Sequence, residues 1–377
     1  MERIQLKPRQ GWQQQFEQLG FTYHSIDDLY WDERYAYRFT SDQIDHLESV
    51  TEELHQMALQ AVGQVVREGS YEKFAIPEPF WKKIEDSWLA GEFSLYGRFD
   101  LSWNGSGEPK LLEYNADTPT GLVESSVAQW YWLQDVFPQH DQFNSLHEKL
   151  IAQWQKISAG KPVHFAGISA SEEDWGNLSY LRDTAMQAGL RTVQLDMADI
   201  GLNADTATFV DQDNQPIQRL FKLYPWEWMC REGFGPALLQ TKMQCIEPAW
   251  KMLLSNKAIL PLLWEMFPNH PNLLAASFDQ WRISGDYVKK PLYSREGDNI
   301  SLYQGSQILR TEGQYGAEGY VYQQLAPLPF YDDGITPAFA CIGSWIVGDQ
   351  AAGIGIREDA TLITKDTSRF IPHFFTE

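Results

Sequence analysis

The chain is poor in cysteine, in positive charge and in long hydrophobic runs. Its three cysteines are odd in number, widely separated and without Cys-x-x-Cys spacing, so they indicate neither a disulfide framework nor a zinc site. Lysine and arginine number 30 against 51 aspartate and glutamate residues, a formal net charge of −21. That balance argues against nucleic acid and anionic membranes as partners, because both need a basic surface. No apolar run approaches the roughly 20 residues of a membrane-spanning helix.

Several familiar signatures are missing as well. The start, Met1-Glu2-Arg3, leads into polar sequence and not into a signal peptide, so we expect a cytoplasmic protein. There is no G-x-S-x-G elbow, no H-E-x-x-H motif and no P-loop. Two carboxylates that flank a sugar are easy to find among 51 acidic residues, so the composition does not identify a glycosidase. The acidity is compatible with a polycationic substrate such as a polyamine, but charge used only for solubility is the favoured explanation.

With 377 residues, 43% of them hydrophobic, the chain is long enough for about two or three closely packed subdomains. Apolar residues between Ile44 and Val65 recur at helical spacing, with Ser41 as the candidate N-cap, and residues 1 to about 90 are predicted to be mostly helical. A strand at 163–168, a helix at 177–189 and a strand at 192–195 form an α/β unit. The last third is predicted to open with a helix at 250–263, followed by short strands at 287–290, 300–302, 319–323, 338–347 and 352–357.

Two segments, 96–100 and 111–117, carry the most informative pattern. Each alternates apolar and polar residues, and turn formers separate them, which predicts a β-hairpin. One face of that hairpin would bring together Arg98, Asp100, Glu113 and Asn115. The three oxygen donors suit Mg²⁺, and the arginine suits a phosphate group in a charged transition state. The alternative is a charged strand pair on a solvated face, which the bulky apolar neighbours disfavour.

Four further segments can contact a nucleotide or an acid, although each is weak alone. Lys290 lies at a strand end before a turn at Gly297, where the local alternative is an exposed lysine. Lys257 lies among apolar residues, where a lysine usually extends its amine to solvent. Residues 319–329 form a strand that runs into prolines, either a hinge whose backbone reads adenine or an edge strand. Arg357 follows small residues and is either an anion clamp or a surface partner of the next two acidic residues.

Taken together, these segments resemble a known family. The motifs, in order, are Gly97-Arg98-Phe99-Asp100, Leu112-Glu113-Tyr114-Asn115-Ala116-Asp117-Thr118-Pro119-Thr120, Ser255-Asn256-Lys257, Lys289-Lys290-Pro291, Tyr322-Gln323-Gln324-Leu325 and Gly353-Ile354-Gly355-Ile356-Arg357. They resemble the synthetase domain of bifunctional glutathionylspermidine synthetase and its stand-alone bacterial paralogues, the acid–amine ligases. The resemblance covers nearly the whole chain, from about residue 10, and it outweighs the local alternatives for Lys257 and Lys290.

The resemblance implies a fold. It is an α/β (α+β) ATP-grasp-like unit over residues 1–377, with an additional preATP-grasp-type α/β subdomain and a helical N-terminal region. Three subregions are implied: a helical part at 1–95, the hairpin with an α/β substrate part at 96–250, and a nucleotide-binding part at 251–377.

The resemblance also implies residue roles. Arg98 would be catalytic, stabilising the transferring phosphoryl group and the tetrahedral intermediate. Mg²⁺, as two ions, would be ligated by Asp100, Glu113 and Asn115. ATP would be bound by Arg98, Phe99, Asp100, Lys257, Lys290, Gly297, Asp298, Gln324, Leu325, Ala326, Leu362, Ile363 and Thr364, with Gly297 and Asp298 in a mobile loop that closes over the phosphates. The acid substrate would contact Thr118, Thr120 and Arg357.

We therefore predict an ATP- and Mg²⁺-dependent carbon–nitrogen ligase, with ATPase activity, that joins a small-molecule acid to an amine through an acyl phosphate. The amidase domain of the bifunctional enzyme has no counterpart here, so hydrolysis of the amide is not expected. The middle region, around 171–175 and 224–228, matches the family weakly, so glutathione and spermidine are not carried over as substrates. Two alternatives stay open: a true glutathionylspermidine synthetase, and a nucleotide-binding protein without ligase activity. The sequence leaves the oligomeric state open.

Overall fold

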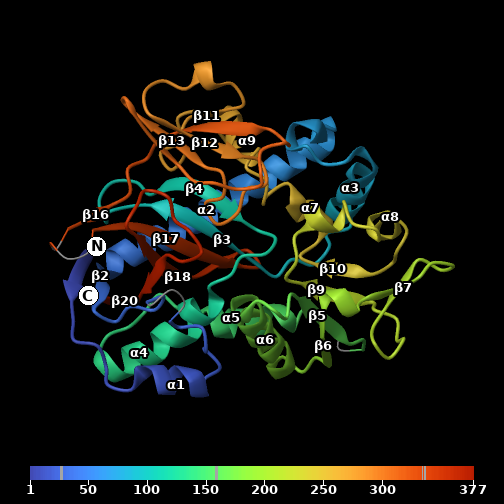
Figure 1. The fold of residues 1–377 in the computed structure, drawn as a ribbon, viewed down its shortest axis with the longest axis horizontal. Helices are drawn as coiled ribbons and strands as arrows, with labels where there is room; N and C mark the ends of the chain where they lie inside the picture. The colour runs from blue at the N-terminus through green and yellow to red at the C-terminus, as the bar shows by residue number, and fades with distance from the viewer. Residues whose placement is uncertain (26–28, 158–159, 333, 335–336) are drawn as a thin grey trace.

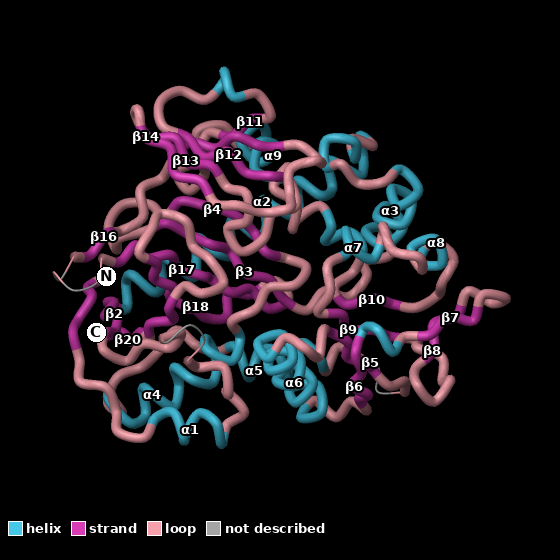
Figure 2. The backbone as a smooth tube through the Cα atoms, in the orientation of Figure 1, coloured by secondary structure: helices cyan, strands magenta, loops and turns pink. Residues whose placement is uncertain are grey.

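The structure is a computed structural model that describes residues 1–377 except 26–28, 158–159, 333 and 335–336. The described part is a mixed α/β fold whose central sheet lies between two other sheets and a layer of helices (Figure 1). Figure 2 shows the strands gathered in the middle, at the top and at the right of the molecule, with helices around them. The predicted α/β class is confirmed.

The central sheet contains the predicted hairpin as two of its strands. Its order is β19-β18-β17-β3-β4, each neighbouring pair is antiparallel, and β16 pairs with β17. The bounds are β3 Tyr96–Ser102, β4 Lys110–Asn115, β16 Phe330–Tyr331, β17 Ala338–Val347, β18 Gln350–Asp359 and β19 Arg369–Ile371. In the hairpin register Arg98 lies opposite Asn115 and Asp100 opposite Glu113, with an irregularity directly after Asp100. The hairpin prediction is confirmed.

Helix α2 (Ser41–Glu68) packs against β17 and β18 with the apolar face predicted from its spacing. Its N-cap is Thr40, not Ser41, because the Thr40 side chain and Gln43 form a reciprocal capping box. Ser41 is thus the first helical residue. The helix ends at Gly69, whose φ of 67° suits a C-cap that lacks a β-carbon. The other longer helices near this end are α1 (Trp12–Gln18) and α3 (Trp81–Leu89).

The prediction that residues 1–90 are mostly helical is partly wrong. Strands β1 (Glu2–Gln5) and β2 (Tyr35–Thr40) form a three-stranded sheet with β20 (His373–Thr376), in the order β1-β2-β20. The β2–β20 pair is parallel and joins the two ends of the chain, which lie together at the left of Figure 1. Local periodicity could not reveal a strand whose partner lies more than 300 residues away.

A four-stranded parallel sheet confirms the predicted α/β unit. Its order is β10-β9-β5-β6, with bounds β5 Val163–Gly167, β6 Thr192–Asp196, β9 Arg219–Lys222 and β10 Gln244–Ile246. Helix α6 (Glu172–Gln187) begins earlier than predicted, because the Ser171 side chain accepts a hydrogen bond from Asp174 N. Helix α5 (Leu146–Trp154) packs on α6, and a hairpin of β7 (Gly201–Asn203) and β8 (Thr208–Val210) extends from this part.

A five-stranded antiparallel sheet follows in the last third, at the top of Figure 1. Its order is β11-β15-β12-β13-β14, with bounds β11 Ala276–Ser277, β12 Tyr287–Pro291, β13 Ser301–Gln304, β14 Gln307–Arg310 and β15 Tyr320–Gln324. The strands predicted here are confirmed with ends shifted by a few residues. The helix predicted at 250–263 is wrong: a 3₁₀ turn, η6 (Ala249–Met252), precedes α9 (Ile259–Met266). Between them, Ala258 N donates to the Asn256 side chain and Lys257 N donates to Leu292 O. These two backbone N–H groups therefore do not donate to carbonyls of a preceding helical turn, and the helix is interrupted.

The shorter helical segments complete the described part: η2 Tyr71–Phe74, η3 Glu78–Phe80, the π-helical η4 Val123–Ala128 with α4 Gln129–Val136, η5 Met197–Asp199, α7 Trp226–Met229, α8 Gly235–Leu238 and η7 Gln280–Arg282. Among the described residues, none of the helices combines the length and the apolar character that crossing a membrane would require.

Candidate active site

One cavity lies where the hairpin, the parallel sheet and the five-stranded sheet meet. The empty space there is about 1430 Å³, counting the part open to solvent. Most residues that the sequence singled out line it: Arg98, Asp100, Glu113, Asn115, Thr118, Thr120, Lys257, Lys290, Gly297, Gln324, Leu325, Ala326, Arg357, Leu362, Ile363 and Thr364. Phe99 and Asp298 are not part of its wall.

The polar face of the hairpin forms the floor of this cavity. Arg98 binds both carboxylate oxygens of Asp100, from Nε at 2.7 Å and from Nη2 at 3.2 Å, and its Nη1 donates to Thr120 O at 2.7 Å. Asn115 Nδ2 donates to Glu113 Oε1 at 2.9 Å and lies 3.5 Å from Asp100 Oδ2. The alternative of a solvated face is wrong, since Arg98 is only 8% exposed.

These side chains fit Mg²⁺ better than a softer metal. No cluster of three His, Cys, Asp or Glu side chains suited to a metal ion exists within the described ranges. The oxygen atoms that could face an ion here belong to two carboxylates and an amide. Mg²⁺ accepts such hard oxygen ligands and completes its shell with water and phosphate. The Asn115 amide presents its nitrogen to the carboxylates, so it would have to rotate to offer its oxygen to an ion.

Two buried lysines face the hairpin from the last third of the chain. Lys257 Nζ forms an ion pair with Glu113 Oε2 at 3.0 Å, and Lys290 Nζ donates to Leu112 O at 2.8 Å and to Gln323 Oε1 at 2.7 Å. They are 5% and 8% exposed, so the local alternatives of a solvent-directed and an exposed lysine are wrong.

The charges in this group change one another's pKa values. Burial alone would raise the pKa of Glu113, but Lys257 and Lys290 hold it well below its ordinary value. Burial lowers the pKa of Lys290 to about 8, with Glu113 opposing that shift. The two lysines therefore keep the Glu113 carboxylate ionised at neutral pH.

A glycine on the central sheet, Gly343, makes space for Arg98. Gly343 and Gly355 lie opposite each other on β17 and β18, and a β-carbon on Gly343 would lie 2.8 Å from Arg98 Cδ. The guanidinium lies 5.6 Å from the centre of the Trp345 ring. The absence of a side chain at Gly343 therefore leaves room for the arginine stem, whereas a β-carbon on Gly355 would meet Ser125 and Phe370.

Arg357 enters the same cavity from β18. Its Nη2 donates to Lys365 O, and its guanidinium lies 5.8 Å from the centre of the Phe370 ring. The alternative in which it pairs with the next acidic residue is wrong, because Glu358 forms ion pairs with Arg3 and Arg369.

The wall opposite the hairpin contains Gln324–Ala326 and Leu362–Thr364. Strand β15 lies between β11 and β12, so the edge-strand alternative is wrong. Gln324 N and Leu325 N already donate to Ala275 O and Asp286 O, at 2.7 and 2.9 Å. These two N–H groups are therefore already hydrogen-bonded within the protein. They are not free to donate to an adenine, as the hinge interpretation of this segment would require.

Two predicted residues point elsewhere. Phe99 is fully buried on the other face of the hairpin, where its ring stacks on Tyr114 at 3.8 Å between centroids. Asp298 Oδ2 accepts from Gln314 N at 3.1 Å. Its neighbour Gly297 has a φ of 73° and approaches Thr364 so closely that a β-carbon would lie 2.7 Å from Thr364 O.

An acidic group beside the cavity was missed by sequence reasoning. Asp174 and Glu296 line the wall, and the half-buried Glu173 and fully buried Glu124 interact electrostatically with this group. Burial, then Glu296, raises the pKa of Asp174 to about 6, and burial, then Glu173, raises the pKa of Glu124 to about 8. The only signal in the sequence was the acidic run at 172–174, which carries no chemistry alone.

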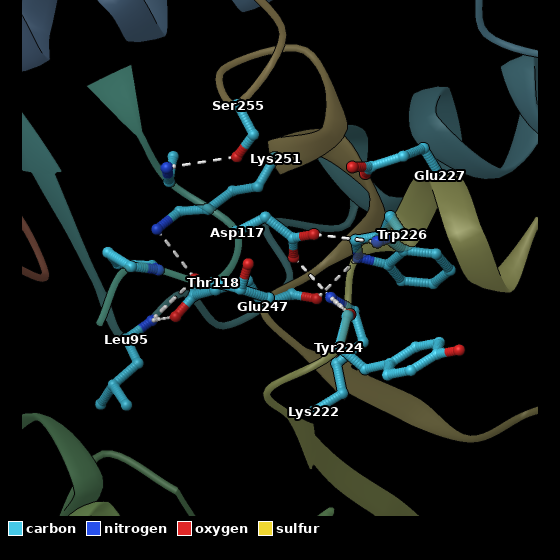
Figure 3. Close-up of polar contacts among 12 residues, drawn as sticks. Leu95, Asp117, Thr118, Lys222, Tyr224, Trp226, Glu227, Glu247, Lys251 and Ser255 are labelled. Carbon is cyan, nitrogen blue, oxygen red and sulfur yellow. Dashed lines mark hydrogen bonds and ion pairs between the residues drawn. The ribbon is translucent and has the colours of Figure 1, made fainter. Parts of the chain in front are cut away.

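A buried network under the cavity was also missed (Figure 3). Asp117, which directly follows the hairpin, pairs with Lys222 of β9, and its Oδ2 accepts from Trp226 N at 2.9 Å. Glu247 pairs with Lys251 at 2.8 Å and also accepts from the backbone of β3. The contacts of Asp117 with Lys222 and Trp226, and that of Glu247 with β3, join residues more than 100 positions apart, so no local pattern could reveal them.

Comparison with known proteins identifies the family. The model of the family described as glutathionylspermidine synthase preATP-grasp matches residues 3–376. A Haemophilus influenzae protein named "Putative acid--amine ligase" is 44% identical over 382 residues, 96% of each chain. Trypanothione synthetase of Crithidia fasciculata is 30% identical over 351 residues, 84% of this chain and 53% of that protein.

A solved structure supports the fold alone. A glutathione synthetase-like effector from Globodera pallida aligns with a TM-score of 0.57 and 9% sequence identity, over 90% of this chain and 89% of that one. Because the family model spans nearly the whole sequence, the chain belongs to the glutathionylspermidine synthase preATP-grasp family.

Proposed function

We propose that this protein is an ATP-dependent carbon–nitrogen ligase that joins a carboxylic acid to an amine. The observation that carries the proposal is the meeting of the hairpin carboxylates, two buried lysines and two arginines in one cavity of a chain from this family. Relatives named as ligase and synthetase support the same reaction class.

We assign the nucleotide to the side of the cavity that lies between the five-stranded sheet and the central sheet. A nucleotide bound between two sheets is what the proposed ATP-grasp-like fold implies. Lys257 and Lys290 are buried and close to the hairpin carboxylates, where they can neutralise phosphate charge. The apolar wall, which includes Leu325, Leu362 and Ile363, suits a flat base.

Asp100, Glu113 and Asn115 would hold Mg²⁺, which supplies charge neutralisation and orientation of the phosphates when it is bound. Arg98 lies beside this set and keeps its guanidinium fixed between Asp100 and Thr120 O. A preorganised cation in a buried site stabilises charge that develops during phosphoryl transfer.

The remaining residues divide the cavity into an anion side and a cation side. The acid would bind on the anion side, which contains Arg98, Arg357, Thr118 and Thr120. The amine would bind on the cation side, next to Asp174 and Glu296. A carboxylate does not react with an amine at useful rates, because its oxygen is a poor leaving group. Transfer of the γ-phosphoryl group to the acid gives an acyl phosphate, and attack by the amine then releases phosphate.

The first test is ATP turnover by the purified protein with Mg²⁺, alone and with pools of acids and amines. We expect one acid–amine pair to stimulate ADP formation and to give a new amide by mass spectrometry. Tight ATP binding without turnover in any pool would contradict ligase activity and favour the nucleotide-binding alternative.

Glutathione with spermidine belongs in these pools, because the family name and the similarity to trypanothione synthetase favour it as a specific second candidate. Formation of glutathionylspermidine at a rate above that of every other pair would establish the second candidate. Formation of a different amide would exclude it while supporting the proposed reaction class.

A further inference from the structure

Arg295 joins three parts of the chain at the edge of the cavity. Its Nε and Nη2 donate to Glu227 Oε1 at 3.0 and 2.8 Å, and its Nη1 donates to Thr118 Oγ1 at 2.7 Å. Glu227 belongs to α7 in the α/β part, Thr118 follows the hairpin, and Arg295 follows β12. We call these three residues the latch.

The latch is anchored at its base by the network of Figure 3. Asp117, next to Thr118, accepts from Trp226 N, next to Glu227, at 2.9 Å. Asp117 also pairs with Lys222, whose side chain is fully buried. Thr118 and Glu227 are therefore held at a fixed spacing, and Arg295 spans that spacing. Two nitrogens of the planar guanidinium share one Glu227 oxygen, and the third donates to Thr118, which fixes the orientation of the Arg295 side chain.

The loop of residues 294–298 is held from both sides. Ser294 O accepts from Lys257 Nζ on the nucleotide side, while Arg295 holds the substrate side. Gly297 packs directly against Thr364. The loop thus covers the place where the acid and the phosphates would meet, and covering that place excludes water.

We propose that Glu227 is a positioning residue which, through Arg295, fixes Thr118 and the 294–298 loop so that the acyl phosphate meets the amine and not water. The inference rests on the proposed function. In the productive step the amine nitrogen bonds to the acyl carbon, the carbon–oxygen bond to phosphate breaks, and the amine loses a proton. In the leak, water attacks the same carbon, and free acid and phosphate result, so ATP is consumed without amide.

The test measures ADP formed per amide formed, with the acid–amine pair found active for the wild type. We expect a ratio near one for the wild type and a rise of several-fold for Glu227→Gln and for Thr118→Val. Glu232→Gln is the matched control, since that carboxylate accepts from Tyr224 and lies outside the latch.

A double variant separates positioning from folding. Glu227→Gln alone leaves a partly buried arginine without its partner, whereas Glu227→Gln with Arg295→Met removes both charges and is better tolerated. We expect the double variant to unfold at a temperature closer to the wild type and still to leak ATP. An unchanged ratio in a folded double variant would overturn the proposal.

A second measurement needs no amide. Hydrogen exchange of peptides covering 294–298, with Mg²⁺ and ATP as the only added ligands, should be several-fold faster in Glu227→Gln and unchanged in Glu232→Gln. Equal exchange in Glu227→Gln and the wild type would also overturn the latch. If the wild type makes no amide, the proposed function fails while this measurement still decides whether the latch holds the loop.

Discussion

Gly343 sets the position of Arg98, and replacing it with alanine tests that idea directly. The new β-carbon would lie 2.8 Å from Arg98 Cδ, 3.3 Å from Nε and 3.4 Å from Cγ. Because ordinary contact begins near 3.4 Å, the stem must move by at least about 0.6 Å, the difference between 3.4 and 2.8 Å. The backbone at Gly343 does not need a left-handed conformation, so only the contact with Arg98 opposes the change.

That displacement lengthens the 2.7 Å contacts of Arg98 with Asp100 and Thr120 O. A misplacement of this size near a developing charge costs about 10- to 100-fold in kcat. Overpacking costs about 1–3 kcal/mol of stability. We expect kcat for amide formation to fall in that range, with the KM for ATP changed by less than about three-fold, since the lysines are untouched.

The assay is initial-rate kinetics of ADP and amide formation, with thermal unfolding measured on the same samples. Gly233→Ala is the control, because a β-carbon there meets nothing within 4 Å and the backbone tolerates it. A folded Gly343→Ala protein with wild-type kcat would refute the reasoning, because Arg98 would then act equally well from a displaced position or not act at all.

Four further substitutions test other parts of the site. Asp100→Ala and Glu113→Ala should each abolish Mg²⁺-dependent ATP turnover while circular dichroism shows a folded protein; retained turnover in both would contradict the metal assignment. Gly297→Ala forces an L residue to a φ of 73° and against Thr364 O, so the KM for ATP should rise about ten-fold or more, and an unchanged KM would argue against closure of this loop on the nucleotide. Asp174 has its pKa raised by burial, then by Glu296, to about 6, so its ionisation opposes folding: its protonated form favours the folded state, and that contribution is lost as pH rises from about 4 to 6. The free energy of unfolding, measured with urea, should therefore fall between about pH 4 and 6 in the wild type by at most about 3 kcal/mol more than it falls in Asp174→Asn. Equal pH slopes in the two proteins would contradict the raised pKa of Asp174.

The parts of the fold set by local pattern were predictable from the sequence. The hairpin follows from alternation and turn formers, and α2 follows from its apolar spacing, although its cap moved by one residue because Thr40 and Gln43 satisfy each other. The break before α9 was not predictable, because Asn256 and Lys257 bond to Phe74 O and Leu292 O, far along the chain. A continuous apolar run hides such an interruption.

The candidate site divides in the same way. Motif residues such as Asp100, Glu113 and Lys290 could be named because a family resemblance links weak local signals. Arg295 and Glu227 could not, because an ion pair between residues 68 positions apart leaves no mark in either segment. Their roles, like those of the predicted site residues, stay predictions until the substitutions are made.

The sheet that joins the two ends of the chain has a consequence for synthesis on the ribosome. Strand β2 pairs with β20, and the fully buried Glu358 forms ion pairs with Arg3 of β1 and Arg369 of β19. During translation, strand β2 therefore has an unpaired edge until residues 373–376 emerge from the ribosome. Arg3 likewise lacks its partner Glu358 until that residue has been made. Closure of this sheet is a long-range event, so the edge of β2 stays exposed to aggregation until residues 373–376 have been made.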